Sequence, residues 1–387
     1  MSVYILSGAR TPSGTFMGPL SQVAAPKLGA TAIKGALEKA KISGDQVDEV
    51  FMGNVVTAGV GQAPARQAAI FAGLPESVPA STVNKVCGSG MKTIIMGVQS
   101  ILAGDNELVV AGGMENMSLA PHLLMNSRTG TRFGATEMKD SMQWDGLWDV
   151  YTDRPMGNCA EECASKFKFS REEQDNFAIE SFTRAQAAMK AGIFSQEIVP
   201  VTITDRKGET IVSEDDGIMK AKFDKIPTLR PAFDKSGTIT AANASTINDG
   251  AAAVILGGEK YAKNAEFKIV ATGSHAQNPT WFTTAPVEAM KKCFAKANLS
   301  TKDVELYEIN EAFAVVTMAA IRELELDPRK VNIYGGGVSL GHPIGCSGTR
   351  IVVTLMTAMK NQKARYGMAS ICIGGGEALA ILLERLG

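Results

Sequence analysis

Residues 83–94, VNKVCGSGMKTI, contain a cysteine at the junction between an expected strand and an expected helix. A short apolar run leads into a Gly-Ser-Gly turn, and apolar residues then recur at helical spacing over residues 91–102. At such a junction, free backbone N–H groups and the positive end of the helix dipole lower the pKa of a thiol and favour the thiolate. We therefore interpret Cys87 as a nucleophile, although an isolated cysteine is more often a small buried hydrophobic residue.

The composition indicates a globular protein with a large core. The 387 residues are 45% hydrophobic and 20% charged, which suits two or three domains. The 39 basic and 40 acidic residues are balanced, so we expect no nucleic-acid partner. We also expect no apolar run of membrane-spanning length and no signal segment, and we predict a cytoplasmic protein. Six cysteines without a C-x-x-C pattern and three histidines favour free thiols over disulfides, and indicate no metal site.

The chain contains an internal repeat. A helix and strand pattern over residues 25–54 recurs over residues 285–310, with Lys39 and Lys296 at an offset of 257. CGSG at 87–90 likewise corresponds to GCSG at 345–348, and the apolar run at 108–115 to that at 370–377. We interpret the chain as two copies of one α/β unit, with an insertion in the first copy. The expected domains are residues 1–116 plus 248–264, the inserted loop domain 117–247, and residues 265–387.

Alternating strands and helices predict mostly parallel sheets that are covered by helices on both faces. Ligands of such sheets bind at the carboxyl ends of the strands. Cys87, Asn310, His342 and Cys372 all lie at or near such ends, so we expect them to share one cleft. His342 stands in a tight loop where an imidazole adds little packing. Taken alone, Cys372 would be interpreted as a core residue. The glycines at 374–376, however, expose backbone N–H groups to a ligand.

Four blocks of sequence resemble the signature blocks of the thiolase family. They are NKVCGSG (84–90), NEAF (310–313), GGGVSLGHPIG (335–345) and CIGGG (372–376), and GGMENMS (112–118) and TAANAS (240–245) extend the match over the whole chain. The likeness is closest to members that join two acetyl-CoA molecules. It implies a duplicated αβαβα layered fold, a loop domain that binds coenzyme A, and a homotetramer built as a dimer of dimers.

The resemblance also implies a role for each candidate residue. Cys87 is acylated after His342 accepts its proton, and Cys372 then removes the α-proton of acetyl-CoA. Asn310 holds a water that forms one oxyanion hole with His342. The N–H groups of Cys87 and Gly374 form the other. The result is a reversible Claisen condensation to acetoacetyl-CoA and CoA that requires no metal or redox cofactor, with the CoA thioesters as substrates.

By resemblance, the residues around the pantetheine and the acyl group are Ser245, Ala241, Met156, Phe233 and Phe313. Phosphate groups need cations, and the nearest basic cluster in the insertion is Lys220, Lys222 and Lys225, which could equally be a solvated charged loop.

The chain departs from the family pattern at two positions. Pro155 stands where short-chain members commonly carry a histidine, which leaves the shape of the acyl pocket open. Glu377 follows the glycines directly, and its charge is expected to raise the pKa of Cys372 by repulsion of the thiolate.

Three alternatives are weighed against this reading. A degradative 3-ketoacyl-CoA thiolase of broader chain length stays open as the main alternative. Decarboxylating or acyl-carrier-protein condensing enzymes typically use two histidines, or histidine and asparagine, so the second thiol disfavours them. A non-catalytic scaffold has no reason to keep Cys87, Asn310, His342 and Cys372 together.

Overall fold

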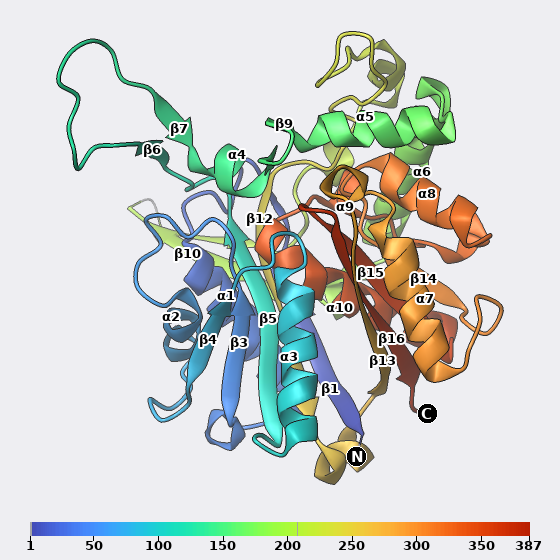
Figure 1. Cartoon of the computed structure of the whole chain (residues 1–387). Coiled ribbons are helices and arrows are strands. Elements are labelled where there is room, and N and C mark those ends of the chain that lie inside the picture. Colours follow the sequence, from blue (N-terminus) through green and yellow to red (C-terminus); the bar gives the residue numbers. More distant parts are fainter. Residues whose placement is uncertain (1, 207) are drawn as a thin grey trace.

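The computed structural model describes residues 2–206 and 208–387. Its central element is a ten-stranded sheet in the order β14-β15-β16-β13-β1-β12-β5-β3-β4, with β2 paired to β12 (Figure 1). The strands of this sheet are β1 (Val3–Arg10), β2 (Gly14–Thr15), β3 (Glu49–Gly53), β4 (Ala80–Val83), β5 (Leu108–Asn116), β12 (Asn248–Gly257), β13 (Phe267–Ala276), β14 (Leu306–Ile309), β15 (Tyr366–Ile373) and β16 (Glu377–Arg385).

The strand order confirms the internal repeat. β1, β12, β5 and β3 of the first half follow one another in the sheet as β13, β16, β15 and β14 do in the second. The two halves meet where β1 and β13 pair antiparallel, from Val3 opposite Ile269 to Ile5 opposite Phe267. The predicted duplicated α/β fold is therefore correct.

The expectation of mostly parallel pairing was wrong. Parallel pairing in this sheet is confined to β3 with β4, β3 with β5, and β14 with β15, and the other pairs are antiparallel. The reason is visible at residues 374–376, where a glycine turn joins β15 to β16. So short a connection can join only antiparallel neighbours, whereas a parallel pair needs a long crossover.

Helices cover both faces of each half. α1 (Ala25–Ala40) and α2 (Pro64–Phe71) pack on the outside of the first half, and α7 (Ala285–Ala297) on the outside of the second. α3 (Ser89–Ala103) and α10 (Ile344–Gln362) pack against each other between the halves. Residues 344–359 of α10 are all buried, as expected for a helix enclosed by two sheets.

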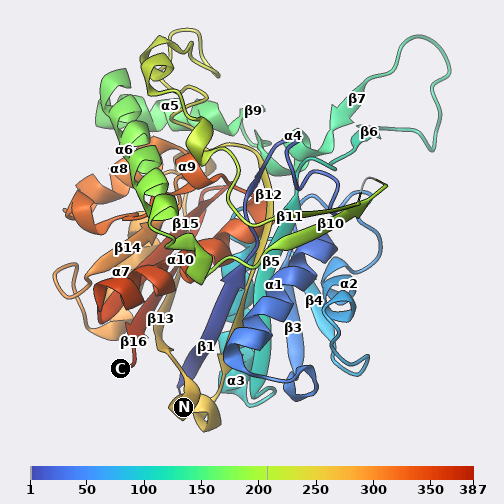
Figure 2. The same cartoon turned by 180° about the vertical axis from the view of Figure 1, so that it is seen from behind.

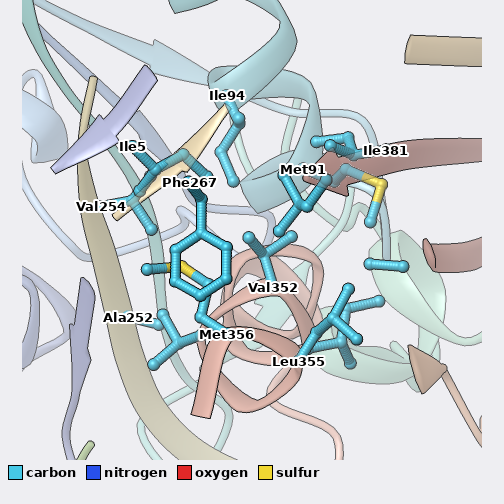
Figure 3. Packing of buried hydrophobic residues seen from close by; sticks show 14 of the residues in the cluster. Ile5, Met91, Ile94, Ala252, Val254, Phe267, Val352, Leu355, Met356 and Ile381 are labelled. Atoms are coloured by element: carbon cyan, nitrogen blue, oxygen red, sulfur yellow. The ribbon is translucent and has the colours of Figure 1, made fainter. Parts of the chain in front are cut away.

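The main core lies around α3 and α10. Figure 3 shows Met91 and Ile94 of α3 beside Val352 and Met356 of α10, with Phe267 of β13 between them and the sheet. Helices and strands from both halves of the chain thus share one apolar core, so the two copies fold against each other rather than as separate units.

One expectation about the membrane was also wrong. Val86–Ala103 is long and apolar enough, by length and composition, to cross a membrane. Yet 56% of this segment is buried inside the protein, and α3 packs against β5 and α10. The core helix of a globular protein passes the same test, so we interpret α3 as a core helix.

The residues between β5 and β12 lie outside the ten-stranded sheet, and α4, α5 and the segment of β6 and β7 lie at the end of the molecule opposite the two termini (Figure 1). α6 (Arg171–Lys190) begins at a capping box of Ser170 and Glu173. Seen from behind, the hairpin of β10 and β11 lies near α1 (Figure 2), and Val199 packs on Gly35 of α1. The elements of this region are β6 (His122–Leu124), β7 (Met138–Asp140), α4 (Ser141–Gly146), β8 (Trp148–Asp149), β9 (Arg154–Pro155), α5 (Met156–Phe167), α6 (Arg171–Lys190), β10 (Val201–Asp205) and β11 (Gly208–Val212).

Two further helices flank the second half of the sheet, α8 (Ala314–Glu323) and α9 (Gly337–Leu340). The short 3-10 helices are Gly44–Gln46, Phe194–Gln196, Ile218–Lys220, Phe223–Thr228, Glu259–Asn264, Pro279–Trp281 and Pro328–Lys330.

Candidate active site

A cavity of about 240 Å³ lies where the two halves and the insertion meet. Three predicted catalytic residues line it: Cys87, His342 and Gly374. A larger hollow of about 390 Å³ between α6 and α8 contains none of these three. The other residues that line the smaller cavity are Met117, Gly146, Leu147, Met156, Gly157, Phe233, Ala244, Ser245, Thr246, Ile247, Phe282, Ala312, Phe313 and Ile344.

Cys87 lies on a strained turn between β4 and α3. Val86 has a φ of 47°, a left-handed conformation that is a genuine outlier for a β-branched residue. Ser89 secures the turn, because its Oγ accepts a hydrogen bond from the Lys85 N–H at 2.8 Å and donates one to the Val86 carbonyl at 2.6 Å. Backbone strain that the surroundings maintain in this way is concentrated at functional sites.

The pKa of Cys87 differs from the expectation. Burial of the sulfur raises the pKa of Cys87 to about 11, although the N–H groups of Gly374 and of Cys87 itself hydrogen-bond to it and lower it. The turn and the helix terminus therefore do not make a free thiolate, because the loss of hydration outweighs the hydrogen bonds. A base must remove the proton when the thiol reacts.

His342 is placed to be that base. Burial and, to a lesser extent, the positive charge of Arg350 lower the pKa of His342 to about 3, so the imidazole is neutral. The Oγ of Ser347 donates to the Pro343 carbonyl at 2.9 Å and lies 2.6 Å from Nδ1 of His342. Since the hydroxyl hydrogen is already used, we assign the hydrogen of the imidazole to Nδ1. Nε2, which has no partner among the described residues, then carries the free lone pair.

Cys372 and Asn310 lie buried behind the cavity wall rather than on it. Cys372 belongs to the buried cluster that contains Phe282 and Phe313, both of which line the cavity. Burial raises the pKa of Cys372 well above its usual value, and the charge of Cys87 raises it further. Asn310 is fully buried, and neither atom of its side-chain amide has a partner among the described residues. Buried amides are nearly always hydrogen-bonded, so this one is available to a water or a substrate.

Glu377 does not act on Cys372 as expected. Its carboxylate pairs with the Lys85 ammonium, and the causes of the raised pKa of Cys372 are burial and the neighbouring thiols, not Glu377. The ion pair neutralises the charge that the sequence suggested would repel the thiolate. Pro155, the other departure, precedes α5 and does not line the cavity, whereas its neighbour Met156 does.

The predicted coenzyme A residues are only partly brought together. Ser245, Met156, Phe233 and Phe313 line the cavity, and Ala241 lines an adjoining open hollow of about 420 Å³. The two hollows share Phe233, Ala244, Ser245, Thr246 and Ile247.

Lys220 belongs to neither hollow. It pairs with Asp216 on a different part of the insertion, and its side chain is 70% exposed. Lys222 and Lys225 are exposed as well.

Two supporting residues were not predicted. Ser347 was noted only as part of the repeat, although its spacing from His342 placed it one helical turn inside α10. Glu115 is fully buried at the end of β5, and its carboxylate accepts hydrogen bonds from Asn54 Nδ2 at 2.6 Å and from the N–H groups of Val55 at 3.0 Å and Gly345 at 2.9 Å. It thereby ties the loop that carries His342 to the first half.

The duplicated fold, and the cavity lined by a thiol and an imidazole with a second thiol buried behind its wall, are those of a thiolase, and comparison with known proteins agrees. The chain belongs to the thiolase family: residues 3–260 match the family model of the thiolase N-terminal domain and residues 263–385 that of the thiolase C-terminal domain.

The relatives cover the whole chain. It is 51% identical over 391 residues to acetyl-CoA acetyltransferase 2 of Arabidopsis thaliana, which covers 99% of this chain and 97% of the relative. It is 50% identical over 390 residues to the mitochondrial acetyl-CoA acetyltransferase of Bos taurus, which covers 99% and 92%. The crystal structure of Acat5 thiolase from Ascaris suum in complex with coenzyme A superposes with a TM-score of 0.95 at 43% identity and covers 100% of both chains.

Proposed function

We propose that the chain is an acetyl-CoA C-acetyltransferase, an acetoacetyl-CoA thiolase that joins two acetyl-CoA molecules and also runs in reverse. The observation that carries this proposal is the placement of the Cys87 thiol and a neutral His342 in one apolar cavity, with Cys372 behind its wall. Full-length relatives that are named acetyl-CoA acetyltransferases support it.

In the first half-reaction, Nε2 of His342 accepts the proton of Cys87 while the sulfur attacks the thioester carbonyl of acetyl-CoA. The tetrahedral intermediate collapses, the carbon–sulfur bond to CoA breaks, and His342 returns the proton to the departing CoA sulfur. The products are acetyl-Cys87 and CoA. Because the resting thiol is protonated and the imidazole is neutral with a free lone pair, the proton moves as the sulfur attacks rather than beforehand.

In the second half-reaction, Cys372 acts as a thiolate: it gives up its own proton and then removes the α-proton of a second acetyl-CoA, and the proton that it gave up returns to the Cys87 sulfur when that sulfur departs. The resulting carbanion attacks the acetyl carbon on Cys87, and acetoacetyl-CoA forms as the Cys87 sulfur departs. Two oxyanions have to be stabilised on the way. The N–H groups of Cys87 and Gly374, which already converge on the Cys87 sulfur, serve one, and His342 with a water held by Asn310 serves the other.

We infer that the pantetheine arm passes through the open hollow into the cavity, past Ser245, Ala241, Met156, Phe233 and Phe313. The five residues shared by the two hollows support this path, as does the coenzyme A in the Ascaris structure. Binding of the coenzyme A phosphates by Lys220, Lys222 and Lys225 is the less well supported part of this proposal, because Lys220 is paired with Asp216. Neutralising all three should raise the KM for acetyl-CoA without changing kcat, and an unchanged KM would reject the cluster.

A direct experiment tests the proposal. Purified protein is mixed with acetyl-CoA, and its intact mass is measured after rapid acid quenching. We expect one acetyl group on Cys87, none on Cys87→Ser, and a normal adduct on the control Cys159→Ser. An unmodified wild-type protein that remains folded would contradict the proposal. Turnover measured over a series of 3-ketoacyl-CoA chain lengths distinguishes the acetoacetyl-CoA thiolase from the degradative 3-ketoacyl-CoA thiolase, since the degradative enzyme would accept long chains.

The homotetramer and the cytoplasmic location remain predictions. The segment of β6 and β7 extends away from the body (Figure 1) and exposes Leu124, Met125, Phe133 and Met138. Exposed apolar groups on a projecting segment are typical of an interface, which supports assembly. Light scattering that gives a monomer mass would contradict the tetramer. The bovine relative is named mitochondrial, so location has to be tested separately.

A further inference from the structure

Two loops of the site lie along each other: the nucleophile loop, residues 84–88, and the glycine loop, residues 373–377. At one end, a methyl group added to Gly88 would collide with the side chain of Ile373. In the middle, a Cβ at Gly374 would lie 3.7 Å from Cγ1 of Val86. At the other end, the Lys85 ammonium pairs with the Glu377 carboxylate. The contacts thus connect a loop of the first half to a loop of the second.

The two N–H groups that face the reacting sulfur lie between these contacts. The N–H groups of Gly374 and Cys87 both hydrogen-bond to the Cys87 sulfur, although they belong to different loops. The distance between these two N–H groups therefore depends on how rigidly the two loops are held against each other. An oxyanion hole needs both donors at about 2.7–3.1 Å from one oxygen, so a small relative movement removes one of them.

The glycine loop has few side chains to hold it in place. Gly375 and Gly376 have φ values of 91° and 84°, which glycine adopts without strain. The backbone holds its ends, where Ile373 pairs with Glu377 and Glu377 with Ala276 in the sheet, and the carbonyl of Gly376 accepts a hydrogen bond from the Gln277 N–H at 2.9 Å. Glu377 is the first side chain after the glycines, and its partner Lys85 is two residues before the nucleophile.

We propose that Lys85 and Glu377 are a positioning pair that holds the N–H groups of Cys87 and Gly374 at the separation required for the oxyanion. The inference rests on the proposed function. Neither side chain lines the cavity, so neither contacts the acyl group there and the pair acts through the two loops. Its effect should therefore fall on the rate of acylation rather than on substrate affinity.

The test compares Glu377→Gln and Lys85→Met with the charge-reversed double variant Lys85→Glu with Glu377→Lys. The rate of acetyl-Cys87 formation is measured at saturating acetyl-CoA by quenched intact mass, together with the KM. We expect each single variant to acylate at least about tenfold more slowly with an unchanged KM, since misplacement by an ångström costs up to about 10²-fold. The reversed pair should recover most of this loss. The matched control Glu266→Gln, which breaks the distant pair of Glu266 and Lys360, should have no effect.

A second readout separates positioning from general damage. Iodoacetamide alkylates Cys87 without forming an oxyanion, so in the single variants its rate should fall less than the rate of acylation, by no more than the loss of the Gly374 N–H lowers the thiolate fraction. Wild-type acylation rates in both single variants, no recovery in the reversed pair, or an equal fall in alkylation would each overturn the inference. A wild-type protein that forms no acetyl-Cys87 would refute the proposed function itself, which distinguishes the two failures.

Discussion

Ser347 contacts the nitrogen of His342 to which we assign the hydrogen. Its Oγ lies 2.6 Å from Nδ1 and donates its own hydrogen to the Pro343 carbonyl, so we assign Nδ1 as the donor in this contact. Nε2 is left as the base. The serine thus does for the imidazole what a buried carboxylate does in other nucleophile and base pairs: it fixes the tautomer and the orientation of the ring.

Ser347→Ala should therefore lower kcat by at least about tenfold, part of the roughly 10²–10⁴-fold that a placed general base supplies. The KM should change little, because Ser347 does not line the cavity. Steady-state kinetics measure this effect. Ser100→Ala is the control, since Ser100 bonds to a carbonyl of its own helix at 3.0 Å and contacts no histidine. A kcat equal to that of the wild type would show that the tautomer is fixed by something else.

The pKa values predict the pH dependence of alkylation at Cys87. The thiolate is the species that reacts, and with a pKa of about 11 its fraction rises about tenfold per pH unit throughout the neutral range. His342, with a pKa of about 3, stays neutral there and adds no inflection. Iodoacetamide inactivation should thus accelerate steadily from pH 6 to pH 9. A plateau across that range would instead indicate a preformed pair of thiolate and imidazolium.

Glu115→Gln should destabilise the protein. Every group that contacts the Glu115 carboxylate is an N–H donor, and the NH₂ of glutamine would face one of them. Leaving a buried donor unsatisfied costs about 1–3 kcal/mol. Urea unfolding at pH 5 measures this loss, because burial raises the pKa of Glu115 to about 7 and the wild type itself loses stability as the carboxyl ionises between about pH 4.5 and pH 7. Glu76→Gln, at an exposed position, is the control. Equal midpoints for the two variants would contradict the role given to Glu115.

The sequence predicted the helices whose apolar residues recur at helical spacing within one short segment. α1, α3, α6 and α10 have helical periodicity, and the repeat correctly paired α1 with α7 and α3 with α10. The predicted parallel pairing of the strands was wrong, because the relative direction of two strands depends on whether the connection between them, such as the one after β15, is a turn or a crossover. The spacing of CIGGG and EALAIL could have shown this.

At the site, Cys87, Asn310, His342 and Cys372 were expected to share one cleft; Cys87 and His342 line the cavity, Asn310 and Cys372 do not, and the state of the thiol differs from the expectation. The pKa of Cys87 depends on burial by residues from distant parts of the chain, which no local motif encodes. The pairing of Lys85 with Glu377 was missed for the same reason, since the two are 292 positions apart.

The central claim is that the two thiols perform separate steps, and Cys372→Ala tests it most directly. Acetyl-CoA is incubated with this variant in deuterated buffer, and both the protein mass and the deuterium content of the acetyl group are measured. Cys293→Ala, which removes another buried cysteine, is the control. We predict that Cys372→Ala still forms acetyl-Cys87 but neither exchanges the α-protons nor makes acetoacetyl-CoA. A folded variant without the acetyl adduct, or one that exchanges deuterium at the wild-type rate, would contradict the account.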